Sequence, residues 1–506
     1  MARLPWSGIA PRSPRNWSWF ENSRKPTQGL VLSGGGARAS FQIGALRYLY
    51  DHAGIAPTTI VGTSAGSILT ALLGQFSDPE EQSGALRALE NVWMSLTDSD
   101  QMFMPRPWFI RLQERSSKWL ELLQAESERP EPKRSLPRIS LFRSPTEAAD
   151  EIATDEDARA VEPEELSGQA RTLAIALSNP VAPARSFSPT LALGLMNMLP
   201  RLRATGDDVS MILRGADASR SMYHPGPVLT TLLDEEFFRS AAVAESGVTV
   251  RVAMVALESG ELRFMTETGE MVDRENRPLP HIPRQDLSLG LLASCSIPAV
   301  FPPVKIGEEW YVDGGVREAT PAEMAIGHLG VDRCWVVASS ATEAPPADSF
   351  ESKSMLNVML RSTQILTEET ERDEIAYAQV AGATVIEPEL FVHDATTVVI
   401  GLMHINRDYG WLRAAEQHLN LHESTVALHR RIIGNRLRAL DLEDKVLLGD
   451  PPEPLLRELA RVKLQIRDDI SWLDPKQLPE GAQDWWRSWE KHDPPVTVPA
   501  PWLTQA

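Results

Sequence analysis

The stretch Gly62-Thr63-Ser64-Ala65-Gly66 limits what this chain can fold into more than any other feature of the sequence. A β-branched run at 59–61 precedes it and predicts a strand, whereas residues 67–73 have the apolar spacing of a helix. The serine therefore stands where a strand turns sharply into a helix. The two glycines permit that turn and the close approach of strand and helix. The turn exposes the serine oxygen, and the positive end of the helix dipole favours negative charge beside it.

A second glycine-rich loop, Gly34-Gly35-Gly36-Ala37-Arg38, lies upstream, between a predicted strand at 29–32 and a helical pattern at 41–50. Successive glycines let backbone N–H groups converge on one point, and in a hydrolase such a concavity binds an oxyanion. The loop also fits the dinucleotide-binding fingerprint. That fingerprint needs an acidic residue at the end of the second strand, where this chain has Val-Gly-Thr-Ser at 61–64. Nucleotide binding is therefore disfavoured.

The third motif is Asp313-Gly314-Gly315, which follows a strand-like run at 310–312. Asp-Gly-Gly alone is a common turn. Here an apolar, proline-fixed segment at 293–303 precedes it, and such a segment suits the wall of a pocket. A buried aspartate at a strand end can accept a proton directly from a neighbouring serine, so this motif completes a nucleophile–base pair with Ser64.

These motifs, with Ala293-Ser294-Cys295-Ser296-Ile297-Pro298 before the last of them, resemble the patatin-like phospholipase family and its bacterial-type members in particular. The resemblance covers roughly residues 28–76 and 222–400, and the order of four motifs makes it specific. One position departs from the pattern, because Ala39 stands where a glycine often follows the arginine. That change affects only the path of the loop.

The resemblance implies a three-layer α/β sandwich around a central, mostly parallel sheet, with a helical insertion and a helical C-terminal region. It implies Ser64 as nucleophile and Asp313 as base of a dyad without histidine. The oxyanion hole would be formed by backbone N–H groups of the loop and supported by Arg38. The full set of implied site residues is Ser64, Asp313, Gly34, Gly35, Gly36, Arg38, Gly62, Gly66, Gly314 and Gly315. The implied reaction is hydrolysis of phospholipid or lysophospholipid acyl esters, or of neutral glycerides, without metal or other cofactor.

Three other functions compete with this one. An α/β-hydrolase triad would need a histidine, and His328, His393 and His404 are available, but none lies in a recognisable setting. Ser64 also follows only the second predicted strand, whereas more strands normally precede the nucleophile in that fold. His404 is interpreted as structural. A non-catalytic lipid-binding or regulatory module is disfavoured by the intact motifs, and an acyltransferase, in which an alcohol replaces water, stays open.

Charge and cysteine content restrict the partners and the compartment. The chain has 506 residues, and its 50 basic and 69 acidic residues give a net charge of −19. This balance argues against nucleic acid and against general attraction to anionic membranes, so contact with lipid would be local and hydrophobic. Two cysteines exclude a disulfide framework, and Cys295 is interpreted as a core residue. Neither a signal peptide nor a transmembrane helix is evident, which predicts a cytoplasmic protein with peripheral membrane contact. The oligomeric state is left open.

The expected organisation is an N-terminal arm at 1–27, a catalytic domain at 28–404 with an insertion at about 77–221, and a helical region at 405–506. Segments 102–120 and 191–200 of the insertion mix apolar and basic residues, which predicts either a lid or helical cover. Trp485, Trp486 and Trp489 predict a membrane-facing belt or a clasp for the terminal helices. His418 and His422 lie one helical turn apart, but no carboxylate partner completes a metal site.

Overall fold

The computed structural model describes residues 26–111, 219–341, 355–492 and 496–504, without the side chains of 355–364 and 366. The N-terminal arm up to residue 25, the part of the first insertion segment beyond residue 111 and the whole segment 191–200 lie outside the described residues.

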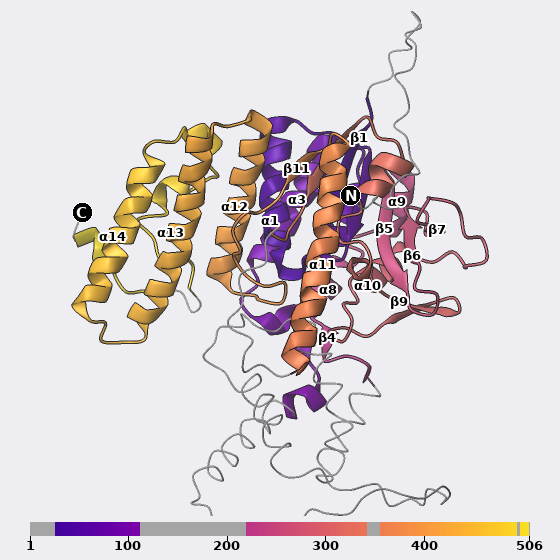
Figure 1. Ribbon diagram of the computed structural model, residues 1–506, viewed down its shortest axis with the longest axis horizontal. Helices are drawn as coiled ribbons and strands as arrows, with labels where there is room; N and C mark the ends of the chain where they lie inside the picture. Colours follow the sequence, from indigo (N-terminus) through magenta and orange to yellow (C-terminus); the bar gives the residue numbers. More distant parts are fainter. Residues whose placement is uncertain (1–25, 112–218, 342–354, 493–495, 505–506) are drawn as a thin grey trace, which may run out of the picture.

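A nine-stranded sheet forms the centre of the described body (Figure 1). Its strands are β1 (Gln28–Leu32), β2 (Thr59–Thr63), β5 (Thr249–Ala256), β6 (Leu262–Thr266), β7 (Met271–Asp273), β8 (Val304–Ile306), β9 (Glu309–Asp313), β10 (Arg333–Val337) and β11 (Thr384–Ile386). The order is β11-β10-β1-β2-β5-β6-β7, and the first five strands are parallel. β6, β7, β8 and β9 pair antiparallel. The expected mostly parallel sheet is confirmed.

The central strands are almost entirely buried, which is typical of parallel strands covered on both faces. Alternate residues enter different cores. In β1, Leu30 and Leu32 belong to one hydrophobic cluster, whereas Val31 belongs to the other. Each strand therefore anchors helices on both faces of the sheet, as the expected three-layer architecture requires.

The described helices are α1 (Ala39–Tyr48), α2 (Ala65–Gly74), α3 (Pro79–Met94), α8 (Pro227–Leu232), α9 (Ser240–Glu245), α10 (Leu287–Ser294), α11 (Met355–Val380), α12 (Ile400–Leu419), α13 (Glu423–Leu447) and α14 (Glu453–Ile470). α1, α2, α3, α10 and α12 contribute to the larger core on one face. α11 and a π-helical turn, η6 (Met324–His328), contribute to the smaller core on the other face. Among the described helices, none is both long and apolar enough to cross a membrane.

The C-terminal part of the described chain is helical, and α12, α13 and α14 lie side by side away from β6 and β7 (Figure 1). The expected helical region contains a break between α12 and α13. Asn420 adopts a left-handed conformation with φ of 48° and ends α12, and His422 caps α13. The expected domain limits stay predictions. The limit expected after residue 404 lies inside α12.

The C-terminal tryptophans pack on these helices. The guanidinium of Arg436 lies 4.1 Å from the ring centroid of Trp485, and Trp489 meets Trp502 edge-on at 5.0 Å. These contacts support the interpretation of the tryptophans as a clasp.

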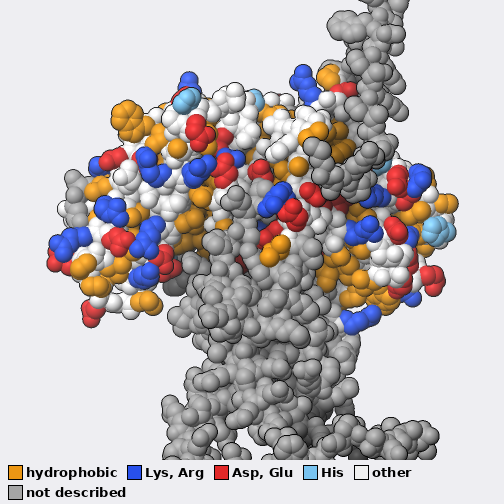
Figure 2. Space-filling model, in the orientation of Figure 1, with side chains coloured by type: hydrophobic (Ala, Val, Ile, Leu, Met, Phe, Trp, Pro, Cys, Tyr) orange, Lys and Arg blue, Asp and Glu red, His pale blue; other side chains and the backbone are white. Residues whose placement is uncertain are grey.

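A buried ion network joins the same helices to the C-terminal segment. Lys463 Nζ lies 2.7 Å from Glu443 Oε1, and both side chains are fully buried. Arg436 pairs with Asp408 at 2.7 Å and with Glu490 at 2.9 Å. Outside this network, acidic and basic side chains are interspersed over the helical surface (Figure 2).

Candidate active site

The sheet topology brings two strand ends together along one edge of β5. β2 runs parallel along that edge, with Thr63 opposite Ala253. β9 runs in the opposite direction with Asp313 opposite Met254, while β6 occupies the other edge of β5. β2 and β9 therefore end at consecutive positions of β5, so Ser64, which follows Thr63, meets Asp313.

Ser64 forms the corner between β2 and α2. Its backbone has φ of 53° and ψ of −128°, a conformation rare for a side chain with a Cβ. Close packing on both sides fixes the corner. A Cβ on Gly66 would lie 2.4 Å from the carbonyl oxygen of Leu32, and one on Gly62 would lie 2.3 Å from Thr70 Oγ1. The structure thus gives a steric reason for both glycines.

Hydrogen bonds from neighbouring residues hold the backbone of this corner. The Ser67 hydroxyl donates to the Ser64 carbonyl oxygen at 2.6 Å. The Ser64 N–H donates to the Ser294 hydroxyl at 3.0 Å. Ser294 ends α10, so this helix clamps the corner from the side of the 293–303 segment. The sequence names Ser294 as part of a motif, but nothing in it reveals this partner.

Asp313 is 5% exposed and has one hydrogen-bonded and one free carboxylate oxygen. Oδ1 accepts the N–H of Gly315 at 2.8 Å, whereas Oδ2 is buried and has no hydrogen-bond partner among the described residues. Burial raises the pKa of Asp313 to about 6, and the Ser64 hydroxyl and the Gly315 N–H oppose that rise. The Ser64 hydroxyl is thus close enough to stabilise the ionised carboxylate of Asp313. The two side chains are not joined by a well-aligned hydrogen bond.

The triple-glycine loop packs beside this pair and offers two free donors. The Gly34 N–H is already engaged, because it donates to the Ala319 carbonyl at 2.9 Å. Ala37 likewise donates to Ala395 at 2.7 Å. In the described part of the chain, the N–H groups of Gly35 and Gly36 have no partner. Gly36 has φ of +54° and lines the same pocket as Ser64. The loop therefore keeps two unpaired backbone donors next to Ser64.

Side chains from other elements hold the loop in place. The Gln42 amide donates to the carbonyl oxygens of Ser33 at 2.8 Å and Val337 at 3.1 Å, which ties α1 to the ends of β1 and β10. Arg38 donates to the carbonyl oxygen of Gly35 through its backbone at 3.1 Å and through Nε at 3.4 Å. Arg38 therefore bonds twice to the loop, while its expected role in an oxyanion hole stays a prediction.

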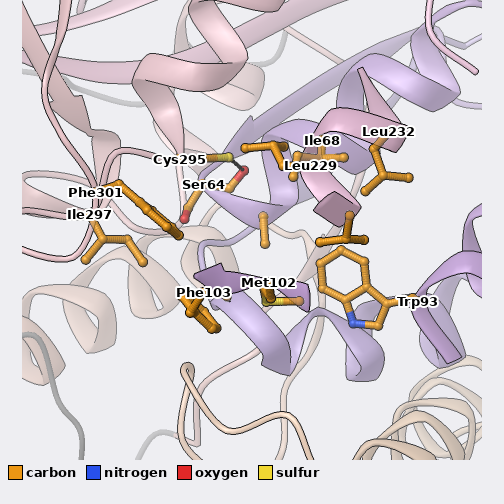
Figure 3. A pocket seen from close by; sticks show the side chains of 13 residues that line it. Ser64, Ile68, Trp93, Met102, Phe103, Leu229, Leu232, Cys295, Ile297 and Phe301 are labelled. Atoms are coloured by element: carbon orange, nitrogen blue, oxygen red, sulfur yellow. Dashed lines mark hydrogen bonds between the residues drawn. The ribbon is translucent and has the colours of Figure 1, made fainter. Parts of the chain in front are cut away.

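An apolar pocket of about 50 Å³ opens at Ser64. Ser64 lies at one end with Cys295 and Phe301, and Trp93 lies at the other end (Figure 3). The expected apolar segment at 293–303 does contribute, through Cys295, Ile297 and Phe301. Its walls are almost purely hydrocarbon, which suits an acyl chain.

Other walls of the pocket come from segments that were not expected to line it. Met102 and Phe103, at the start of the expected lid or cover, line the pocket, whereas Trp108 and Phe109 behind them are buried. Trp93 of α3, with Leu229 and Leu232 of α8, was missed as pocket lining. The available signal was the apolar spacing of Leu86, Leu89 and Trp93, which are buried together.

The described histidines do not form a triad with Ser64. The His393 ring contacts the carbonyl oxygen of its neighbour Asp394 at 2.9 Å, and burial lowers its pKa to about 4. Burial likewise lowers the pKa of His404 to about 4. Neither ring lines the pocket or bonds to Ser64 or Asp313. Cys295 is buried, and burial raises the pKa of its thiol, which agrees with a core residue.

Within the described ranges, no group of three or more histidine, cysteine or acidic side chains is arranged to hold a metal ion. His418 lies 3.2 Å from the Tyr48 hydroxyl, and His422 Nδ1 accepts the N–H of Ser424 at the start of α13. Both rings are thus used in packing and capping.

A family model described as "Patatin-like phospholipase" matches residues 30–326. The chain is also similar to "Triacylglycerol lipase SDP1L" of Arabidopsis thaliana, with 38% identity over 73 residues. The match covers 14% of this chain and only 8% of that relative's length.

Two solved structures are similar along most of the chain. VipD from Legionella pneumophila is 13% identical, with a TM-score of 0.27 and coverage of 94% of this chain and 93% of that one. The ExoU–SpcU complex of the type III secretion system of Pseudomonas aeruginosa gives 15% identity, a TM-score of 0.20 and coverage of 95% and 74%. At such TM-scores neither adds to the argument.

Proposed function

The chain belongs to the patatin-like phospholipase family, and from this premise we propose that it is a serine acyl hydrolase of phospholipids or lysophospholipids. The observation that carries the proposal is that β2, which leads into Ser64, and β9, which ends at Asp313, reach consecutive positions of β5. The free donors of Gly35 and Gly36 and an apolar pocket lie at the same point. These are the parts that acyl transfer through a serine requires.

The first half of the reaction follows from the hydrogen-bonding pattern. Asp313 Oδ2, which has no other partner, accepts the proton of the Ser64 hydroxyl as its oxygen attacks the ester carbonyl carbon. The N–H groups of Gly35 and Gly36 donate to the oxyanion that forms. Each well-placed donor of this kind contributes about a hundred- to a thousand-fold in rate. Collapse of the intermediate returns the proton from Asp313 to the leaving alcohol and leaves Ser64 acylated.

The second half repeats these steps with water. Asp313 takes a proton from the attacking water, the same donors bind the second oxyanion, and the acid leaves while Ser64 regains its proton. A carboxylate whose pKa has been raised to about 6 is a stronger base than a solvated one, yet it is still ionised at neutral pH. Burial of Asp313 therefore serves the proton transfer directly.

The pocket binds the acyl chain of the ester, because its walls offer hydrocarbon and few polar groups. Met104 and Ile110, beside the pocket segment, are 44% and 39% exposed. We propose that such apolar side chains give the protein a local, peripheral contact with a lipid surface from the cytoplasmic side. Vesicle flotation of the wild type and of M104E tests this contact, and equal flotation would contradict it.

Two alternatives use the same fold. A lipid-binding module would bind lipid without turnover, and an acyltransferase would pass the acyl group from Ser64 to an alcohol. Product analysis with and without added glycerol separates acyl transfer from hydrolysis.

The testing experiment compares wild type, S64A, D313N, H393Q and H404A on a chromogenic short-chain ester and on phospholipid vesicles. The proposal predicts loss of activity in the two dyad variants alone. Loss in a histidine variant that still folds would point to a triad. An inactive wild type on both substrates would favour the binding module.

A further inference from the structure

A two-stranded ladder beside the pocket carries two nitrogen-bearing side chains for which the proposed reaction has no role. The ladder consists of β3 (Phe103–Pro105) and β4 (Tyr223–Pro225), paired antiparallel. The Phe103 ring stacks on Phe301 at 5.6 Å between centroids, and both side chains line the pocket. The Tyr223 N–H donates to the Val300 carbonyl at 2.9 Å, so the ladder is attached to the pocket wall.

Arg106 follows β3 and is held by three contacts. Its N–H donates to the Met222 carbonyl at 2.8 Å, and its Nε donates to the Ser221 hydroxyl at 2.8 Å. Its Nη1 lies 3.2 Å from His224 Nε2. A guanidinium can only donate, so Nε2 must accept, and His224 is neutral with its proton on Nδ1. In the part of the chain that the structure describes, Arg106 Nη2 and His224 Nδ1 make no further hydrogen bond.

No carboxylate neutralises this pair among the described residues. By contrast, two buried arginines of the body have acidic partners: Arg251 pairs with Glu267 at 2.8 Å and Arg263 with Glu309 at 3.1 Å. Burial and, to a smaller extent, the charge of Asp100 raise the pKa of Tyr223 on the same ladder, but Asp100 makes no ion pair with Arg106.

The pKa shifts of the pair agree with this arrangement. Burial lowers the pKa of Arg106, and burial together with the Arg106 charge lowers that of His224. Hydrogen bonds hold the positive charge of Arg106 next to a neutral histidine. A bound anion would stabilise this pair by neutralising that charge.

We propose that Arg106 and His224 bind the phosphate group of the lipid whose acyl chain enters the Ser64 pocket. The proposal rests on the acyl hydrolase function and names the residues by which the site would select a phosphate-bearing lipid over a neutral acylglycerol. The planar guanidinium of Arg106 donates N–H groups to phosphate oxygens. A bound phosphate also favours the protonated form of His224, whose ring then donates a hydrogen bond to the phosphate. The ladder is joined to the pocket wall through Phe103 and Tyr223, and His224 lies opposite the exposed Met104 in it.

The test compares dihexanoyl phosphatidylglycerol with dihexanoylglycerol, both as monomers, in wild type, R106Q, R106K and H224N. The measured quantity is kcat/KM for the phospholipid divided by kcat/KM for the glyceride. R106Q is expected to lower this ratio by about ten-fold or more, because it removes hydrogen bonds to a charged phosphate. R106K keeps the charge without the planar fork and is expected to lower the ratio less. H224N is expected to lower it in the same direction. R333Q, at the exposed start of β10, is the control and should leave the ratio within about two-fold.

A second arm measures inhibition of p-nitrophenyl butyrate hydrolysis by inorganic phosphate. Weaker inhibition in R106Q together with the lowered ratio supports a head-group site. Weaker inhibition with an unchanged ratio would mean a free-phosphate site and would overturn the assignment to the lipid. An unchanged ratio and unchanged inhibition in folded R106Q would overturn it as well. Failure of the wild type to cleave any of the three esters would instead reject the hydrolase function.

Discussion

The backbone N–H of Ser64 donates its hydrogen bond to the hydroxyl of Ser294 at 3.0 Å. This contact engages the backbone donor of Ser64, whereas the proposed oxyanion donors lie in the glycine loop. It also helps to hold Ser64 at its uncommon φ of 53°.

Replacement of Ser294 by alanine is therefore expected to weaken both the fold and the reaction. A buried N–H without a partner costs about 1–3 kcal/mol of the free energy of unfolding. The looser serine corner is expected to lower kcat more than it raises KM. Urea denaturation and steady-state kinetics measure the two effects. S471A removes an exposed hydroxyl and should change stability by no more than about 0.5 kcal/mol. Equal stability and kcat in S294A and wild type would show that the clamp is dispensable.

The dependence of kcat/KM on pH is expected to follow the ionisation of Asp313. Only the ionised carboxylate can accept the Ser64 proton, so activity should be full above its pKa and fall ten-fold per pH unit below about pH 6. A neutral ester such as p-nitrophenyl butyrate keeps the substrate from contributing its own titration. An acid limb near pH 4 would instead point to His393 or His404, whose pKa values are lowered to about 4.

The chain length of the preferred acyl group is expected to depend on Trp93. Its ring closes the end of the pocket opposite Ser64, so a smaller side chain extends the space for substrate (Figure 3). Each added methylene that becomes buried contributes about 0.8 kcal/mol, or roughly four-fold in kcat/KM. A series of p-nitrophenyl esters should thus show W93A, and to a smaller extent W93F, shifted toward longer chains. L89A on the same helix removes a buried side chain that does not line the pocket and is the control. An identical profile in W93A and wild type would place the acyl chain elsewhere.

The C-terminal helices are expected to depend on the buried pair Lys463–Glu443. Removing one partner leaves an uncompensated buried charge, so K463M should lower the free energy of unfolding by about 3–5 kcal/mol. K445M breaks an exposed pair with Asp441 and should cost at most about 1 kcal/mol. Denaturation curves for the two variants give the comparison. Equal losses would mean that Lys463 is readily replaced by an apolar side chain.

Local features of the sequence were enough to predict much of the fold. β1 and β2 are short apolar or β-branched runs bounded by glycine or polar residues, and each was expected where it occurs. The helices expected at 41–50 and 67–73 coincide with α1 and α2 over most of their length. These elements depend on spacing and propensity within a few residues, which the sequence states directly.

Contacts between distant segments could not be predicted in this way. Nothing near Ser64 indicates that Ser294 accepts its N–H, and nothing near Gly34 indicates that Ala319 occupies its donor. The far end of the pocket was missed because Trp93 belongs to an amphipathic helix whose apolar face reads as ordinary core. The motifs indicated which residues to examine, whereas the pairing of β2 and β9 along β5 explains why Ser64 and Asp313 meet.

Covalent trapping tests the central claim, that Ser64 is the nucleophile activated by Asp313, most directly. The purified protein is incubated with a fluorophosphonate, and the labelled residue is identified by peptide mass spectrometry. The account predicts labelling of Ser64 in the wild type, no labelling in S64A, and labelling at least about a hundred-fold slower in D313N. Labelling of another residue, persistent labelling in S64A, or an unchanged rate in D313N would contradict it.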